Sequence, residues 1–203
     1  MLAAGVDGCR GGWVVATDEF VVVAPTFRDV LGVVGDGVVA IDIPIGLPEA
    51  GSRACDVAAR RAIGPRRSSV FPAPVRRALS WAAWPEASGM SKQAFNLLPK
   101  IREVDDVMTP ALQARVCEAH PELSLATLAG RPMAHPKRTA AGVAERMAAL
   151  GLSAVPRVPG AGIDDVLDAY AVLWTAKRVQ RADERRLGDG AVDAKGLRME
   201  IVV

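Results

Sequence analysis

The feature that most constrains the fold is residues 5–13, GVDGCRGGW, near the start of the chain. An apolar run, residues 2–6, delivers one carboxylate, Asp7, and a glycine-rich turn then leads into a second apolar run. Two short apolar runs around such a turn are typical of a β-hairpin. A strand position normally favours Val or Ile, so the Asp7 carboxylate must be solvated, hydrogen-bonded or bound to a cation. An aspartate that merely helps to form the turn is the alternative.

The N-terminal quarter predicts the start of a mixed sheet. We expect strands at residues 2–6, 13–17 and 20–24, arranged as an antiparallel meander. Asp7 directly follows the first strand of this meander. The strands next to it in the sheet therefore determine which side chains lie beside that carboxylate.

A helix and a fourth strand should follow the meander. Residues 26–34 have helical apolar spacing with Thr26 as an N-cap, and the apolar run 38–43 is broken by Asp42. A strand reached through a helical crossover is normally parallel and central. We therefore expect residues 38–43 to pair in parallel with residues 2–6.

The remainder is expected to complete a single domain, residues 1–203, with a mostly helical insertion at about 49–100 that covers the carboxylate cleft. A strand near Glu118 should precede a short helix opened by Pro121. The C-terminal segment 188–203 alternates in a way that predicts a hairpin or edge strand. Further helices are expected at 52–63, 74–84, 91–108 with an interruption at Pro99, 138–150 and 163–181.

Composition and cysteine spacing exclude several classes of protein. Half of the residues are hydrophobic and 24% are charged, which is typical of a folded globular chain. A net charge of +2 does not by itself indicate nucleic-acid binding, so any basic surface must be local. The scattered Cys9, Cys55 and Cys117 support neither a zinc knuckle nor a disulfide framework. With no signal-peptide pattern and no membrane-length apolar run, we expect a cytoplasmic protein that does not contact a membrane.

Acidic residues recur at strand ends and on the late helix. Asp7 and Asp42 follow two strands, Glu118 lies near a third, and Asp165 and Asp168 share one helix face. Carboxylates gathered in one cleft need a cation, and hard oxygen ligands suit Mg²⁺ or Mn²⁺. Two such ions can clamp the attacking and leaving oxygens of a phosphodiester. Each acid alone has a structural alternative, such as a cap, a turn or an ion pair, but together they favour a metal site.

Five motifs, in order along nearly the whole chain, resemble the DUF429 family of predicted RNase H-like nucleases. They are GVDGCRGGW at 5–13, IDIPIGLP at 41–48, SSVF at 68–71, EAHPE at 118–122 and DDVLDA at 164–169. The resemblance implies an α/β fold with a mixed five-stranded RNase H-like sheet and helices on both faces. From the wider superfamily, which includes the RuvC-type resolvases, it implies Asp7, Asp42, Asp165 and Asp168 as catalytic acids and metal ligands.

Two features depart from that pattern. The second acid of the superfamily is often Glu, whereas this chain has the shorter Asp42. Glu118 has no settled equivalent; we include it among the catalytic candidates, although it could instead anchor the insertion. The neighbouring His120 is a candidate ligand or general base, and a structural histidine held before a proline is an equal alternative.

A substrate with phosphate groups would need cations near the acids. Arginine binds phosphate in a bidentate manner, and hydroxyls in a Gly-Pro-framed loop can add hydrogen bonds. The predicted substrate-binding residues are Arg10, Arg66, Arg67, Ser68, Ser69 and Lys137.

Three functions are compatible with these residues. The first is a metal-dependent nuclease that acts on DNA or RNA. The second is a nucleotide-binding or phosphotransferase protein with the related actin-like core, in which the glycine turn cradles phosphate. The third is a non-catalytic RNase H-like scaffold, for which the acids need not converge. The sequence leaves the oligomeric state open, and a homodimer is compatible with it.

Overall fold

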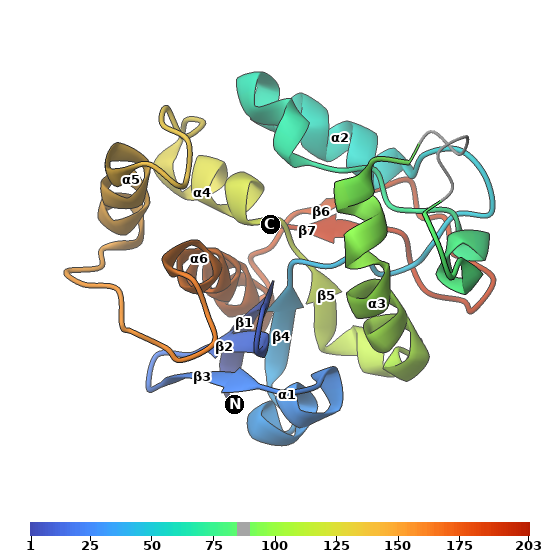
Figure 1. Ribbon diagram of the computed structural model, residues 1–203, viewed down its shortest axis with the longest axis horizontal. Helices are drawn as coiled ribbons and strands as arrows, with labels where there is room; N and C mark the ends of the chain where they lie inside the picture. The colour runs from blue at the N-terminus through green and yellow to red at the C-terminus, as the bar shows by residue number, and fades with distance from the viewer. Residues whose placement is uncertain (85–89) are drawn as a thin grey trace.

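The computed structural model describes residues 1–84 and 90–203, and its centre is a mixed five-stranded sheet in the order β3-β2-β1-β4-β5 (Figure 1). β1, β2 and β3 are antiparallel neighbours, whereas β4 pairs in parallel with β1 and β5 pairs in parallel with β4. The predicted fold class and the predicted parallel pairing are therefore confirmed. The strands are β1 Ala3–Cys9, β2 Gly12–Ala16, β3 Val21–Ala24, β4 Val38–Ile41 and β5 Val116–Glu118.

The first hairpin is tighter than the sequence predicts. β1 continues to Cys9, which pairs with Gly12, so Asp7 lies within the strand opposite Val14. Gly12 has φ 132°, a conformation that favours glycine, and a Cβ there would lie 2.2 Å from the Ala24 carbonyl oxygen. Because the turn is confined to Arg10 and Gly11, the glycine-rich segment does not interrupt β1 at Asp7.

One face of the sheet is covered by α6 (Ile163–Gln180), which packs directly on β1. The contact requires Gly5, because a Cβ at that position would lie 2.0 Å from the Ala169 carbonyl oxygen. Gly5 and Asp7 point to the same face of β1, since side chains alternate along a strand. The close approach of α6 therefore brings its inner residues beside Asp7.

The opposite face is covered by α1 (Phe27–Val34) and α3 (Lys92–Val107), as Figure 1 shows at the bottom and right. Thr26 caps α1 through a capping box with Asp29, as predicted for this residue. Buried Val6 and Trp13 from the sheet pack with Phe27 of α1 in one core cluster. Helices thus cover both faces, and burial of these apolar side chains drives their docking.

α3 runs without interruption through Pro99, so the predicted break there is wrong. A proline inside a helix loses one backbone hydrogen bond and crowds the preceding turn. Pro99 is exposed, whereas Leu98, Ile101 and Val104 of the same helix are buried in the core. Burial of that face outweighs the local cost.

In its described residues, 42–84 and 90–91, the connection from β4 to α3 contains α2 (Ala54–Ile63) and the 3₁₀ helices η1 (Gly64–Ser69) and η2 (Arg76–Ser80). η2 replaces the longer helix predicted for 74–84. The Leu79 carbonyl accepts a hydrogen bond from Arg102 Nε at 2.9 Å, so it is used by a tertiary partner instead of a further helical turn. Residues 85–89 of the expected insertion lie outside the described residues, and the division into a domain with an insertion stays a prediction.

The C-terminal half begins at the end of β5 and returns along the α6 face. α4 (Pro121–Ala129) opens at Pro121 as predicted, and α5 (Ala140–Leu150) and α6 follow. The last residues form a small antiparallel pair, β6 (Arg186–Leu187) with β7 (Ile201–Val202). A single bridge joins Val202 to Ala119, so the predicted edge strand is present in a much shortened form.

Candidate functional site

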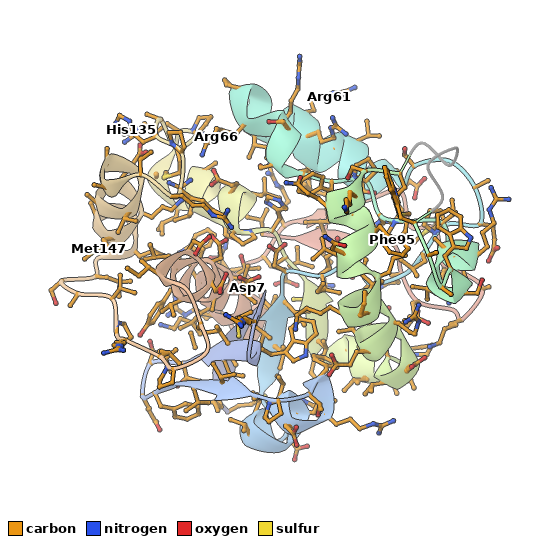
Figure 2. The ribbon with its side chains drawn as sticks, viewed as in Figure 1. Asp7, Arg61, Arg66, Phe95, His135 and Met147 are labelled. Carbon is orange, nitrogen blue, oxygen red and sulfur yellow. The ribbon has the colours of Figure 1, made fainter. Side chains whose placement is uncertain are left out.

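A pocket of about 570 Å³ lies where β1, β4 and β5 meet the helices. Asp42 N donates to the Val6 carbonyl at 3.0 Å, and Ala119 N donates to the Ile41 carbonyl at 2.9 Å, so the three strands end side by side. Figure 2 shows Asp7 near the centre of the molecule at this edge. All the predicted catalytic acids line the pocket: Asp7, Asp42, Glu118, Asp165 and Asp168.

Asp7 is the most strongly perturbed of these acids. The residue is 9% exposed, on a central strand beneath α6. Burial raises the pKa of its carboxyl well above the usual range, and the charges of Asp168 and Asp42 raise it further. A buried carboxylate so close to other acids is held in a high-energy state unless a cation or proton neutralises it.

Asp168 is buried and Asp42 is half-buried, and the charges of both raise the pKa of Asp7. Burial raises the pKa of Asp42. Burial also raises the pKa of Asp168, to about 6, although the ammonium of Lys137 opposes the change. Lys137 Nζ donates to Asp168 Oδ2 at 2.5 Å. Burial would lower the pKa of Lys137, but the charges of Asp168, Asp7 and Asp42 outweigh it and raise that pKa.

These four side chains form what we call the acid cluster: Asp7, Asp42, Asp168 and Lys137. Three carboxylates in this cluster face one ammonium. The cluster therefore retains excess negative charge whenever its acids are ionised.

Asp165 has a different environment from its helical neighbour Asp168. It lies in the first turn of α6, where its Oδ2 accepts a hydrogen bond from Gly162 N at 2.9 Å. This bond satisfies one of the free amide groups at the helix start. Asp165 still lines the pocket and contributes to the raised pKa of Asp7. The i, i+3 spacing thus brings both acids to the pocket, with a helix-capping contact at Asp165.

Glu118 belongs to a second buried group, which we call the arginine cluster: Glu118, Arg53 and Asp56. Arg53 Nη1 and Nη2 donate to the two Glu118 oxygens at 2.7 and 2.6 Å, and Arg53 Nη2 donates to Asp56 Oδ1 at 2.6 Å. Ile45 N adds a bond of 2.7 Å to Glu118 Oε2. Both oxygens of Glu118 are therefore engaged by structural partners.

The partners of Glu118 were missed by sequence reasoning. Arg53 and Asp56 are three residues apart on one face of the start of α2, a spacing that signals an ion pair. The distance of 65 residues between Arg53 and Glu118 carries no local signal.

The predicted substrate-binding residues divide into two groups. Arg66, Ser68, Ser69 and Lys137 line the pocket. Arg10 and Arg67 are exposed, and neither is among the described residues that line the pocket. Arg66 Nη2 donates to the His135 carbonyl at 3.1 Å, and Figure 2 shows both residues above the sheet.

A family model described as a protein of unknown function, DUF429, matches residues 5–191. The chain belongs to the DUF429 family. Searches of curated proteins and of solved structures found no match to it. In the described part of the chain, no helix is both long and apolar enough to cross a membrane.

Another cation of this DUF429 protein, Lys100, lines the pocket although it was not among the predicted substrate-binding residues. Its Nζ donates to the Gly12 carbonyl at 2.6 Å and lies 4.1 Å from the centroid of the Trp13 ring. Burial lowers the pKa of this ammonium, and the nearby acid Glu103 opposes that change. Lys100 thus fastens α3 to the turn that follows Asp7.

His120 of the DUF429 protein joins β5 to the η1 loop. Its Nε2 lies 3.1 Å from the Ser69 carbonyl oxygen, and because a carbonyl oxygen only accepts, this nitrogen is the donor of that bond. Its Nδ1 is buried and has no hydrogen-bond partner among the described residues. His120 also lowers the pKa of Asp42 against the effect of burial. The structural alternative for His120 therefore has a visible partner at Nε2.

The donor set for a metal is incomplete in this arrangement of the DUF429 protein. Among residues 1–84 and 90–203, no group of three or more His, Cys, Asp or Glu side chains is arranged to hold a metal ion. Lys137 instead supplies positive charge to the acid cluster. Any ion would have to share Asp168 with this ammonium or displace it.

Proposed function

We propose that this DUF429 protein is a metal-dependent nuclease that hydrolyses nucleic-acid phosphodiester bonds at the acid cluster. The observation that carries the proposal is three carboxylates around one ammonium: Asp7 in β1 and Asp168 on α6 are buried, and Asp42, after β4, is half-buried. Burying like charges costs stability, and a protein that merely needed a rigid scaffold could use apolar residues there. Perturbed acids in a pocket are typical of an active site.

The charges and donor types of the cluster fit a hard divalent cation. Asp7, Asp42 and Asp168 would hold Mg²⁺ or Mn²⁺, since carboxylate oxygens are the preferred ligands of both. Mg²⁺ commonly keeps several waters and takes one or two carboxylates plus substrate phosphates. Two of these three carboxylates, together with waters and a substrate phosphate, would therefore suffice for Mg²⁺. When bound, such an ion activates water and withdraws charge from the phosphate.

The protein's own residues would then contact the substrate and hold the acids in position. Lys137, already at Asp168, provides an ammonium that can move to a phosphate oxygen once a metal neutralises the acids. Lys100 holds the turn beyond Asp7 against α3 through its bond to the Gly12 carbonyl. Glu118 and Arg53 keep the ends of β4 and β5 together.

The two alternative functions receive less support. In a phosphate cradle, the amides of the glycine turn point at the ligand, but Gly11 N donates to the Gly160 carbonyl at 3.0 Å. A non-catalytic scaffold gives no reason for the acids to gather at one pocket, yet Asp7, Asp42 and Asp168 all line it.

The deciding experiment replaces Asp7 by asparagine. We expect Asp7→Asn to abolish Mg²⁺- or Mn²⁺-dependent cleavage over a panel of single- and double-stranded DNA and RNA substrates, because it removes a central carboxylate at nearly constant size. The matched control is Asp36→Asn, which makes the same change at an exposed turn. Cleavage by Asp7→Asn at the parental rate would exclude the acid cluster as the catalytic site. Calorimetric titration of Mg²⁺ into both variants tests metal binding independently of the substrate.

A further inference from the structure

The pocket has an apolar wall that the proposed hydrolysis does not use. Its lining includes Pro44, Val70, Phe71, Pro72 and Leu97, in addition to the acids. Phe71 is 45% exposed and Leu97 is 38% exposed, whereas the neighbouring Val70 is 2% exposed. An aromatic ring open to a pocket is an available binding surface, because it gains apolar burial when a ligand covers it.

The backbone around Phe71 is held on both sides. On one side, the Ser69 carbonyl is bonded by His120 Nε2 at 3.1 Å and Val70 is buried. On the other side, Ala73 N donates to Asp56 Oδ2 at 3.0 Å, and Asp56 belongs to the arginine cluster. A buried ionic cluster thus holds a segment whose aromatic side chain stays exposed. A ring on a fixed backbone loses little conformational entropy when it binds a ligand.

The cations of the pocket are already paired with the protein itself. Lys100, Lys137, Arg66 and Arg138 each bond to a carboxylate or carbonyl of the chain. A long polyanion needs a row of free cations along its backbone, and the net charge of the protein is +2. The pocket, at about 570 Å³, has the size of a site for one small ligand. Charge and volume therefore favour a ligand with few phosphates and a planar apolar part.

We propose that Phe71, together with Leu97 and Pro72, forms a subsite for one unpaired nucleobase. The base belongs to the nucleotide whose phosphate lies at Asp7, Asp42 and Asp168, so this inference rests on the proposed nuclease function. A base in a duplex is stacked on both faces and paired along one edge, so it cannot enter such a subsite without leaving the helix. The substrate class is then a single-stranded end, a loop or a short oligonucleotide.

The test compares two ligands that cannot be cleaved. One is a dinucleotide with a methylene group in place of the bridging oxygen, and the other is the same backbone with the bases removed. Calorimetric titration with Mg²⁺ should give roughly 5- to 150-fold tighter binding of the base-bearing ligand by the parent protein, the range expected for stacking of one base. In Phe71→Ala that ratio should fall to about one, while Phe71→Tyr, which keeps a ring, should retain it.

Two controls separate stacking from loop structure. Phe71→Leu keeps apolar volume without a planar ring, so it should lose most of the ratio while melting at the parental temperature. Val33→Ala truncates a comparably exposed apolar residue on α1, away from the pocket lining, and should change nothing.

The outcomes also separate this inference from the proposed function. Equal binding of both ligands by the parent, or an unchanged ratio in Phe71→Ala, overturns the subsite and leaves the nuclease function standing. If Mg²⁺ does not bind the parent and neither ligand binds with it, the proposed function fails and the subsite fails with it.

Discussion

Two groups of acids, mostly buried, line the same pocket: the charges of one group are balanced by a cation, and those of the other are not. In the arginine cluster, one guanidinium engages both Glu118 oxygens and Asp56, and backbone amides add further bonds. In the acid cluster, three carboxylates share one ammonium, and the pKa of Asp7 is raised by burial and by Asp168 and Asp42. Burial of acids is common to both, so burial alone does not identify a functional residue. The imbalance of charge is what distinguishes the acid cluster.

The largest effect should come from breaking the balanced group. Arg53→Met leaves Glu118 and Asp56 buried without a partner, which should lower the free energy of unfolding by about 3–5 kcal/mol. Urea denaturation of both proteins measures this difference in the free energy of unfolding. The control is Arg61→Met, because Arg61 points outward from α2 (Figure 2). A loss below about 1 kcal/mol would show that the arginine cluster contributes little to stability.

The acid cluster should make Mg²⁺ affinity depend on pH. Burial raises the pKa of Asp168 to about 6, so lowering the pH through 6 adds a proton that Mg²⁺ must displace. We expect the dissociation constant to rise as the pH falls, by at least about tenfold per unit below pH 6, because Asp7 and Asp42, whose pKa values burial also raises, must lose a proton as well. Titration calorimetry between pH 5 and 8 measures this. A flat profile would mean that Asp168 is not a ligand.

Without metal, Asp7→Asn should stabilise the protein, in contrast to Arg53→Met. The raised pKa of Asp7 means that its ionised form lowers stability at pH 7, and the change removes this cost. The gain should shrink as the pH falls through the raised pKa and vanish near the ordinary aspartate pKa of about 3.9. Melting temperatures at pH 7.5 and 4 check both parts. A loss of stability at pH 7.5 would identify Asp7 as a structural hydrogen-bond acceptor.

The smallest effect concerns the ammonium. Lys137→Met removes a positive charge that competes for Asp168, so Mg²⁺ should bind roughly 3- to 10-fold more tightly at low salt. Lys92→Met, an exposed change at the start of α3, is the matched control. Weaker Mg²⁺ binding by Lys137→Met would indicate that Lys137 orients the carboxylates instead of competing with the metal.

The features that could be predicted from the sequence are those with local signals. The hairpin around Asp7, the crossover to β4 and the i, i+3 acids of α6 follow from periodicity and glycine placement. The uninterrupted α3 at Pro99 and the short η2 could not be predicted, because tertiary packing and the Arg102 bond decide them. The same limit applies to the site.

All five acids reached the pocket, but the sequence could not distinguish Glu118 from Asp168. Both are buried acids at the ends of strands or on helices, and what separates them is the partner. Arg53 and Lys137 come from segments far away in the chain, 65 and 31 residues from their acids. Partner choice is therefore a property of the folded chain that residue patterns do not encode locally.

The backbone contact at Gly5 has a consequence for how this site tolerates change. Most core positions can absorb a substitution when neighbouring side chains adjust, but here the neighbours are main-chain atoms of Ala169 and Leu173. The spacing between the carboxylates of β1 and α6 is therefore set by a missing methyl group. Substitutions that change side-chain volume elsewhere in the core can be accommodated without moving the acids relative to one another. One added carbon at position 5, in contrast, would push β1 and α6 apart and separate their carboxylates.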